Sequence, residues 1–544
     1  MKSTMQDFPL TVASVLRHAA SVHGDRQVIT AVTPGSSRRS TYAELGERSA
    51  QLANALRDLG ITGDERVATF QWSNQEHLEA YAAVPSMGAV LHTLNLRLPP
   101  HQLSYIAGHA EDRVVIVDDT LVPLLARALP EMGTVHTVLV AGSGDTSVLE
   151  GHGKEVLRYD EVLAAQAPTF DWPVVDETSA AAMCYTSGTT GNPKGVVYSH
   201  RSMWLHSQAA CTHNALGIAY DDTVLAIVPM FHANAWGLPY AAMMAGAQLL
   251  LPGPFLQAAP LVAMIEAERP TMSGAVPTIW NDILNYVRDN PGHDLSSLKM
   301  VACGGSAVPR SLMTAFDELG IRIVQAWGMT ETSPLAAVAL APAGLSAEEA
   351  MRLRGTQGRV VAGVEARIVD DTGLVMPHDG KSVGELEVRG PWVTASYYGG
   401  EDSEKFHDGW LRTGDVGLID PAQFITLTDR AKDVIKSGGE WISSVELENE
   451  LIGHPDVLQA AVIGVPDEKW QERPLAAVVR KPGAAATPDE LREFLSDRVA
   501  KWWLPDSWSF IDAVPLTGTG KFDKKVLRQQ YADGELTVEN SSRA

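Results

Sequence analysis

The segment from Tyr185 to Gly195 concentrates residue types that can hold a phosphate group. It reads Tyr-Thr-Ser-Gly-Thr-Thr-Gly-Asn-Pro-Lys-Gly, with three glycines, four serine or threonine residues and one lysine. Glycine lets the backbone approach a ligand closely, so successive N–H groups and hydroxyls can bind phosphate oxygens while the lysine adds a cation. The spacing differs from that of a Walker A loop, because here the lysine follows a proline. The predicted phosphate contacts are Thr186, Ser187, Gly188, Thr189, Thr190, Gly191 and Lys194.

A second group of residues, from Gln325 to Glu331, could bind the rest of a nucleotide. It reads Gln-Ala-Trp-Gly-Met-Thr-Glu. An aromatic face can stack on a purine, a threonine hydroxyl can bond a phosphate, and a carboxylate is a ligand that Mg²⁺ prefers. The heptad alone also fits an ordinary turn before a helix. Its functional interpretation therefore depends on the phosphate-binding segment upstream.

Together these motifs resemble the adenylate-forming superfamily, which includes acyl-CoA synthetases, peptide-synthetase adenylation domains and firefly-type luciferases. The motifs follow the family's order from about residue 180 to residue 528, and residues 25–118 have its general texture, so the resemblance covers nearly the whole chain. It implies an α/β fold with a large N-terminal domain of layered sheets and helices and a small mobile α+β C-terminal domain. It also implies ATP, Mg²⁺ and coenzyme A as ligands.

The resemblance further implies which residues contact the nucleotide. Gly304 and Gly305 would let nucleotide and acyl chain pass close to the backbone, and the Asp415 carboxylate would accept hydrogen bonds from both ribose hydroxyls. Trp327 stands where the family usually has tyrosine, so stacking would survive while a phenol hydrogen bond would be lost. Outside the phosphate-binding segment, the implied contacts are Gly304, Gly305, Ser306, Gln325, Ala326, Trp327, Gly328, Met329, Thr330, Asp415 and Arg430.

The motifs after residue 428 imply a second domain that rotates. Lys432, within the charged cluster Asp429–Asp433, would be the pivot. Gly438 and Gly439 would leave room for the pantetheine arm of coenzyme A once the domain has turned. Trp441 stands where many relatives have asparagine, and tryptophan is expected there in the long-chain fatty acyl branch. The contacts implied for this second state are Lys432, Lys436, Gly438, Gly439 and Trp441.

Lys521 would be the main catalytic cation. Attack of a carboxylate on the α-phosphorus of ATP brings two anions together and develops charge on the bridging oxygen, and a lysine can offset both. Its Gly-rich surroundings suit a side chain that enters for one half-reaction and leaves for the other. Thr186 and Glu331 would hold the metal. The predicted catalytic residues are Lys521, Glu331, Thr186 and His232.

The segment from Thr223 to Ile265 contains no Asp, Glu, Lys or Arg. Prolines, glycines and polar residues interrupt it too often for a membrane-spanning helix, so it suits the wall of an apolar cavity. An uncharged wall excludes amino acids, whose ammonium group would need a buried partner. Trp236 resembles the gate of long-chain fatty acyl-CoA synthetases, and residues 501–505 also resemble that branch. We therefore expect a medium- or long-chain fatty acid, held by His232, Ala233, Trp236 and Gly237.

Composition limits the cellular partners and setting. The 544-residue chain has a formal net charge of -23 and a pI of about 5.1, without a run of Lys and Arg, so we expect no nucleic-acid partner. Its three cysteines lack metal-ligand spacing and their number is odd, which favours the cytoplasm. Residues 1–18 do not resemble a signal peptide, and no transmembrane segment is expected. A homodimer is compatible with the sequence.

The order of apolar runs predicts the architecture. Short strand-like runs at 114–117, 138–140 and 224–228 alternate with helical patterns at 42–59 and 260–268, which indicates layered α/β structure with mostly parallel sheets. The pattern of apolar and charged residues changes at the charged cluster near residue 430. We therefore predict an N-terminal adenylation domain over 1–430 and a C-terminal domain over 431–544.

The sequence leaves other functions open. The enzyme could activate another small apolar carboxylic acid, or it could be a fatty acyl-AMP ligase that loads a carrier protein instead of coenzyme A. A luciferase-like oxygenase would need a luciferin site that the sequence cannot reveal. A non-enzymatic nucleotide-binding protein would be expected to lack Glu331 or Lys521, and both are present.

Overall fold

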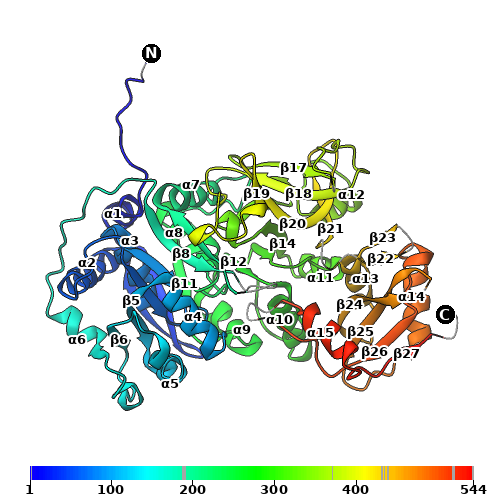
Figure 1. The fold of residues 1–544 in the computed structure, drawn as a ribbon, viewed down its shortest axis with the longest axis horizontal. Coiled ribbons are helices and arrows are strands. Elements are labelled where there is room, and N and C mark those ends of the chain that lie inside the picture. Colours follow the sequence, from blue (N-terminus) through cyan, green and yellow to red (C-terminus); the bar gives the residue numbers. More distant parts are fainter. Residues whose placement is uncertain are drawn as a thin grey trace.

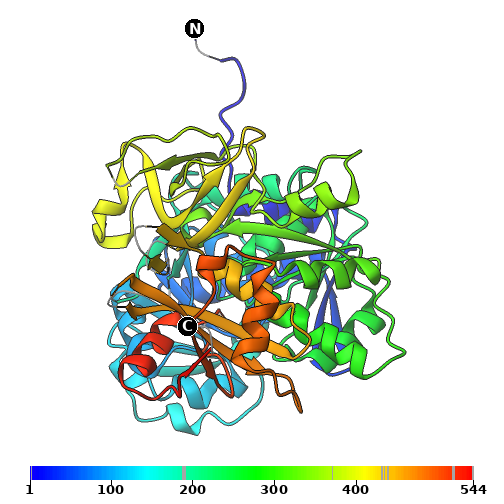
Figure 2. The same cartoon turned by 90° about the vertical axis from the view of Figure 1, so that its right-hand side faces the viewer.

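The computed structural model of the chain describes residues 1, 3–186, 192–370, 372–430, 433, 435–437, 440–467, 469–517 and 521–541, with backbone alone at 430, 436, 440 and 441. The strands of these residues form four sheets. Three belong to a large N-terminal part, and the fourth lies in a smaller lobe at the right of Figure 1. Figure 2 shows this lobe in front of the larger part.

A seven-stranded sheet is built from the first third of the chain. Its order is β7-β6-β5-β3-β4-β8-β9, and only β9 is antiparallel to its neighbour. Runs such as Val114–Val117 are apolar on both faces, as expected for parallel strands covered by helices on both sides. Its strands are β3 Arg66–Phe70, β4 Val90–Thr93, β5 Asp112–Asp118, β6 Thr137–Ala141, β7 Glu155–Arg158, β8 Ala180–Tyr185 and β9 Gly195–Ser199.

A nine-stranded sheet lies beside it, in the order β16-β15-β14-β13-β12-β10-β11-β1-β2. The strands from β14 to β1 are parallel, and the flanking ones are antiparallel. Its strands are β1 Gln27–Thr33, β2 Ser36–Thr41, β10 Thr223–Leu225, β11 Gln248–Leu251, β12 Met272–Ala275, β13 Met300–Gly304, β14 Arg322–Gly328, β15 Leu335–Val338 and β16 Arg359–Val360.

Helices join these two sheets and cover their outer faces. One apolar core contains residues of both sheets together with α1, α2, α3, α7 and α8, while α9, α10 and α11 pack into a separate core on the nine-stranded sheet. The helices of this part are α1 Val12–Val22, α2 Tyr42–Asp58, α3 Gln75–Ser86, α4 Pro100–Ala110, α5 Val122–Leu125, α6 Tyr159–Ala164, α7 His200–Ala210, α8 Leu238–Ala245, α9 Ala258–Glu268, α10 Pro277–Asp289, α11 Arg310–Glu318 and α12 Ala347–Arg354. The predicted helices at 42–59 and 260–268 are therefore confirmed.

A five-stranded antiparallel sheet, yellow in Figure 1, completes the large part. It pairs β17 with β18, β18 with β20, and β20 with both β19 and β21. Its strands are β17 Glu365–Val369, β18 Gly384–Arg389, β19 Phe406–His407, β20 Trp410–Ile419 and β21 Ile425–Arg430.

The smaller lobe has its own six-stranded sheet and its own apolar cores. The sequence pattern of residues 488–500 predicts a helix there, but the helix ends at Ser496 because the next turn tightens and Arg498 N–H bonds the Leu495 carbonyl. The elements are β22 Ile435–Ser437, β23 Glu440–Ile442, α13 Ser444–Ile452, β24 Val457–Asp467, β25 Gln471–Arg480, α14 Pro488–Ser496, β26 Ser507–Phe510, α15 Lys524–Ala532 and β27 Glu539–Asn540.

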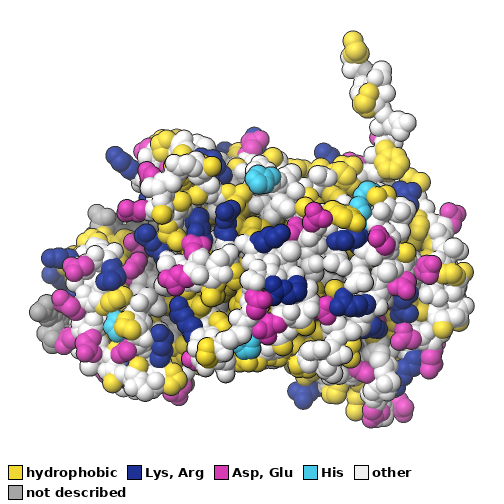
Figure 3. All heavy atoms as spheres, turned by 180° about the vertical axis from the view of Figure 1, so that it is seen from behind, with side chains coloured by type: hydrophobic (Ala, Val, Ile, Leu, Met, Phe, Trp, Pro, Cys, Tyr) yellow, Lys and Arg dark blue, Asp and Glu magenta, His cyan; other side chains and the backbone are white. Residues whose placement is uncertain are grey.

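This architecture confirms the predicted fold class, an α/β large part with a small α+β lobe. The domain boundary at residue 430 stays a prediction. Among the helices described, none is both long and apolar enough to cross a bilayer. On the face shown in Figure 3, acidic and basic side chains are intermixed over the surface.

Candidate active site

A cavity of about 320 Å³ lies where the carboxyl ends of β8, β13 and β14 meet the segments 231–236 and 397–405 and the residue Lys521. The carboxyl edge of parallel strands is the usual place for a ligand in such sheets. Many of the residues predicted from the motifs line it. These are Thr186, Lys194, His232, Ala233, Trp236, Gly304, Gly305, Ala326, Trp327, Gly328, Met329, Thr330, Glu331 and Lys521.

Some predicted residues do not line the cavity, and others lie outside the residues that the structure describes. Ser306 is exposed on the surface. Gly237 and Asp415 are not among the lining residues, although each directly follows one that is. The predicted contacts Ser187, Gly188, Thr189, Thr190, Gly191, Lys432, Gly438 and Gly439 lie outside the described residues, as do the side chains of Arg430, Lys436 and Trp441.

Gln325 is buried, and its side chain forms hydrogen bonds with backbone groups of the protein. Its amide oxygen accepts the Val308 N–H at 2.8 Å, and its amide nitrogen donates to the Thr356 carbonyl at 2.5 Å. These bonds tie the loop after β13 to the segment after α12. Gln325 thus supports the cavity from behind instead of facing it.

The base of the phosphate-binding segment is closed by two hydrogen bonds. Thr186 N–H donates to the Lys194 carbonyl at 2.9 Å, and Lys194 N–H donates to the Thr186 hydroxyl at 3.4 Å. The Lys194 ammonium pairs with the Asp402 carboxylate, which comes from a segment far along the chain. The cationic end of the cavity is therefore built from both regions.

Glu331 is held at the same end of the cavity. Its side chain is buried, and its Oε1 accepts a hydrogen bond of 2.6 Å from the Tyr397 hydroxyl. Its backbone carbonyl accepts the Thr394 N–H at 2.8 Å. No group of three His, Cys, Asp or Glu residues that could form a metal cage occurs among the described residues. One carboxylate suffices for Mg²⁺ bound together with substrate phosphates, so Glu331 fits a metal carried by ATP.

Trp327 connects two of the predicted motifs. Its indole N–H donates to Asp415 Oδ2 at 2.9 Å, while Thr413 and Gly414 line the cavity beside it. A tryptophan N–H can only donate, so the carboxylate is a suitable partner. This bond fixes the plane of the ring that is expected to stack on the purine.

The backbone around Trp236 has an uncommon conformation. Four consecutive residues other than glycine, Ala233 to Trp236, have φ between 42° and 56°, and Gly237 follows at 72°. Each such residue costs roughly 1–2 kcal/mol, so the surrounding packing must hold the turn. A Cβ at Gly237 would lie 2.6 Å from His206 Nδ1, which leaves room for glycine alone.

The Trp236 ring lies against two glycines of the nine-stranded sheet. A Cβ on Gly304 would be 3.5 Å from Trp236 Cη2, and one on Gly274 would be 3.6 Å from its Cε3. The left-handed turn thereby places the indole against β12 and β13, where it lines the cavity.

Lys521 reaches the cavity from the smaller lobe. Its Cε lies 3.3 Å from the position of a Cβ on Gly305, whose φ is +87°. Burial, together with the charges of Lys521 and Arg97, lowers the pKa of His232 to about 3. His232 is therefore neutral at physiological pH, beside a cationic lysine.

The charged and aromatic residues Tyr397, Asp402 and Lys405 are among the cavity residues that were not predicted from the sequence. They lie between β18 and β20, in a segment whose composition is that of an ordinary surface loop. The aromatic pair Tyr397-Tyr398 is the one feature that could have drawn attention to it. Only the folded chain brings this segment into contact with Lys194.

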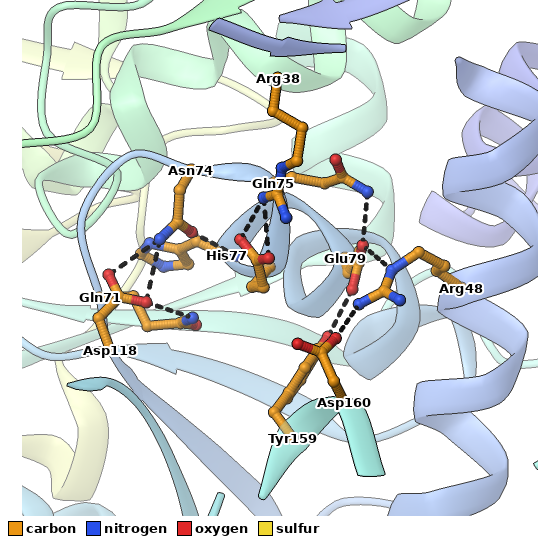
Figure 4. Close-up of polar contacts among 11 residues, drawn as sticks. Arg38, Arg48, Gln71, Asn74, Gln75, His77, Glu79, Asp118, Tyr159 and Asp160 are labelled. Carbon is orange, nitrogen blue, oxygen red and sulfur yellow. Dashed lines mark hydrogen bonds and ion pairs between the residues drawn. The ribbon is translucent and has the colours of Figure 1, made fainter. Parts of the chain in front are cut away.

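A second cluster of charged side chains surrounds α3, apart from the cavity (Figure 4). Glu79 is fully buried and bonds Arg48 at 2.5 Å, Tyr159 at 2.7 Å and Gln75 at 2.9 Å. Asp118 accepts bonds from Asn74 and Trp72 within 3.0 Å. None of the residues drawn in Figure 4 lines the cavity.

Comparison with known proteins gives consistent similarities. The family model "AMP-binding enzyme" matches residues 16–398, and "AMP-binding enzyme C-terminal domain" matches 446–521. A 3-methylmercaptopropionyl-CoA ligase of Ruegeria lacuscaerulensis is 45% identical, covering 98% of this chain and 99% of its own. A medium-chain-fatty-acid–CoA ligase of Ectopseudomonas oleovorans is 43% identical, covering 100% and 99%.

A long-chain-fatty-acid–CoA ligase of Thermus thermophilus is 45% identical over 97% of both chains. The crystal structure of an anthranilate CoA ligase in complex with anthranoyl-AMP superposes with a TM-score of 0.88 at 27% identity, covering 98% of this chain and 100% of that one. The family models span both parts of the molecule, and the relatives match it almost end to end. The chain belongs to the AMP-binding enzyme family.

Proposed function

We propose that this protein is an ATP-dependent fatty acid–CoA ligase. A carboxylate and ATP give acyl-AMP and pyrophosphate, and coenzyme A then gives the acyl thioester and AMP. The observation that carries the proposal is the meeting of Lys194, Glu331 and Lys521 at one cavity. Relatives named as fatty acid–CoA ligases, 43% and 45% identical over nearly the whole chain, support it.

In the first step, a carboxylate oxygen forms a bond to the α-phosphorus while the bond to the pyrophosphate oxygen breaks. The Lys521 ammonium offsets the repulsion between the two anions and the charge that develops on the bridging oxygen. Lys194 and the backbone at Thr186 hold the phosphates in place. Mg²⁺, when bound, would neutralise phosphate charge, and Glu331 with Thr186 would hold it.

His232 has a part in this step that depends on its neutrality. A neutral imidazole beside the carboxylate can donate one hydrogen bond that orients it, without transferring a proton to it. The nucleophile therefore stays ionised. Its low pKa follows from burial and from Lys521, the cation that the same step needs.

In the second step, the thiol sulfur of coenzyme A forms a bond to the acyl carbon and AMP leaves with its oxygen, while the thiol proton passes to solvent. Lys436, Gly438, Gly439 and Trp441 are proposed to serve this half-reaction after the smaller lobe turns about Lys432. The single state of the structure has Lys521 at the cavity, which suits the first step.

The acid is proposed to be aliphatic. The apolar part of the cavity lining is formed by Leu94, Leu98, Ile106, Leu216, Phe231, Trp236, Ala302 and Leu335. The charged residues among the described lining are Lys194, Glu331, Asp402, Lys405 and Lys521. An ammonium group would have no carboxylate partner on the apolar wall. A short thioether acid is the second candidate, because a 3-methylmercaptopropionyl-CoA ligase is 45% identical.

The test is a substrate profile. The kcat/KM for straight-chain acids from C2 to C18 and for 3-(methylthio)propanoate is measured at saturating ATP and coenzyme A, with hydroxamate trapping of the adenylate. Each CH₂ that the wall buries contributes about 0.8 kcal/mol, somewhat under fourfold per carbon. The rate should climb from acetate and level off where the wall ends. A flat profile, or an amino acid as best substrate, would show that the acid is misassigned.

Trp236→Ala separates the wall from the nucleotide site. It should blur the chain-length preference and leave the KM for ATP nearly unchanged, whereas Trp470→Ala, a change at an exposed tryptophan of the smaller lobe, should alter neither. Measuring free coenzyme A consumption distinguishes a CoA ligase from an enzyme that loads a carrier protein.

The setting and assembly are also proposals. We place the enzyme in the cytoplasm, supported by three cysteines without a disulfide. A homodimer is proposed, and light scattering with size-exclusion chromatography tests it. Titration of the first half-reaction with Mg²⁺ tests the metal.

A further inference from the structure

The loop between β18 and β20 adds charged residues to the phosphate end of the cavity. Lys405 ends a short 3₁₀ turn, Ser403–Lys405, and lines the cavity with Asp402 and Tyr397. None of these three belongs to the motifs that identify the family in this sequence.

Tyr397 is the fixed point around which these charges gather. It is buried, its ring packs against Phe406 at a centroid distance of 5.3 Å, and its hydroxyl bonds Glu331. The Lys194 ammonium lies 5.6 Å from the ring centroid and the Lys405 ammonium 5.9 Å from it. Both lysines are therefore held near the carboxylate that is expected to hold the metal.

The two lysines differ in their partners. Lys194 is paired with Asp402, whereas Lys405 has no ion pair with any carboxylate in the part of the chain that the structure describes. At about 6 Å the attraction between an ammonium and an aromatic ring is weak. Lys405 thus presents a charge to the cavity that its own surroundings do not neutralise.

We propose that Lys405 is a second binding residue for the β- and γ-phosphates of ATP, and for pyrophosphate as it leaves. This inference rests on the proposed function, whose first step releases pyrophosphate. When the bond from the α-phosphorus to the bridging oxygen breaks, negative charge accumulates on the leaving group. A cation on the 390–409 loop, near the same tyrosine ring as Lys194, stabilises that charge, while Lys521 serves the α-phosphate.

The test compares three variants of the full-length enzyme. Lys405→Met removes the charge and keeps the length of the side chain, Lys405→Arg keeps the charge, and Lys381→Met changes an exposed lysine in the β17–β18 connection as the control. The affinities for Mg-ATP, pyrophosphate and AMP are measured by equilibrium binding without any acid. The two half-reactions are measured separately, the second from preformed acyl-AMP.

Loss of a charged hydrogen bond predicts about a tenfold weaker affinity of Lys405→Met for ATP and pyrophosphate. AMP affinity and thioester formation should stay within about twofold, since neither involves these phosphates. Lys405→Arg should retain most of the affinity, and Lys381→Met should match the unmodified enzyme.

Two results would overturn the inference: unchanged affinity for pyrophosphate, or equal losses for ATP and AMP, which would show that Lys405 only supports Tyr397. Failure of the proposed function is recognised separately. In that case the unmodified enzyme binds ATP but forms no adenylate with any acid. The comparison of ATP and pyrophosphate affinities among the variants still tests whether Lys405 binds phosphate.

Discussion

The cavity and the network around α3 both gather charged side chains in the interior, but they differ in what those charges face. Around α3, Glu79 meets Arg48, Tyr159 and Gln75, so its oxygens are occupied by protein donors (Figure 4). At the cavity, Glu331 has a tyrosine on one oxygen and borders open space with Lys521.

This difference distinguishes a buried charge that stabilises the fold from a buried charge that can bind a ligand. A buried charge whose hydrogen bonds all go to protein groups contributes to one fixed arrangement. A buried charge beside a cavity keeps capacity for a ligand, and Gly305, where an added Cβ would lie 3.3 Å from Lys521 Cε, leaves room there for the lysine side chain. Charge and burial alone would not distinguish Glu79 from Glu331, since both are buried carboxylates bonded to a tyrosine.

Lys521→Ala should have the largest effect and only on function. Adenylate formation should fall by roughly 10²–10³-fold, the size seen when one donor to a developing charge is removed. Thioester formation from preformed acyl-AMP should fall much less, and the urea midpoint should stay unchanged. Equal losses in both half-reactions would remove Lys521 from its step-specific role.

Glu79→Gln should show the opposite pattern. It leaves Arg48 without its buried carboxylate, and breaking a buried pair costs about 3 kcal/mol of unfolding free energy. The kcat of the folded enzyme should be unchanged. Urea denaturation and steady-state kinetics on the same preparation check both halves, and a normal midpoint with a lowered kcat would contradict the comparison.

Glu331→Gln makes at the cavity the same replacement that Glu79→Gln makes beside α3. An amide is a weaker ligand than a carboxylate for a hard cation, so the Mg²⁺ concentration for half-maximal adenylation should rise, by about tenfold if one charged contact is lost. Stability should change little, because the amide can still accept the Tyr397 hydrogen bond. An unaltered Mg²⁺ titration would exclude Glu331 from the metal site.

His77 gives the smallest and most specific effect. Burial lowers its pKa to about 4, so the folded protein keeps it neutral while the unfolded chain takes up a proton below about 6.5. Its contribution to stability is present above pH 6.5 and is lost as the pH falls toward 4. His77→Gln should therefore lose less unfolding free energy between pH 7 and pH 5 than the unmodified protein, with no change in the pH profile of kcat/KM.

Much of the cavity could be predicted because its motifs are local. Thr186, Gly304 and Gly328 each fall at or just beyond the carboxyl end of a strand, and parallel strands bring those ends together. The apolar runs also predict the α/β layering, since buried parallel strands are continuously apolar.

The features that could not be predicted depend on which way a side chain points and on contacts between segments that are far apart in the sequence. Gln325 shares a heptad with Glu331, but strand alternation turns its side chain toward Val308 instead of the cavity. Tyr397 and Lys405 enter through an irregular loop whose path is set by the pairing of β19 with β20. No periodicity in the sequence encodes that path.

The left-handed turn at 233–236 also shapes how the enzyme can change through mutation. Branched side chains are poorly tolerated at positive φ, so few single replacements in this turn can be accepted. Glycine at Ala235 would be an exception, because it adopts this conformation freely. Laboratory evolution toward bulkier acids thus has two routes. Wall side chains can be replaced by smaller ones, or a replacement in the turn can make the position of Trp236 less rigid. The second route broadens the range of acids that are accepted while the Trp236 side chain itself is kept.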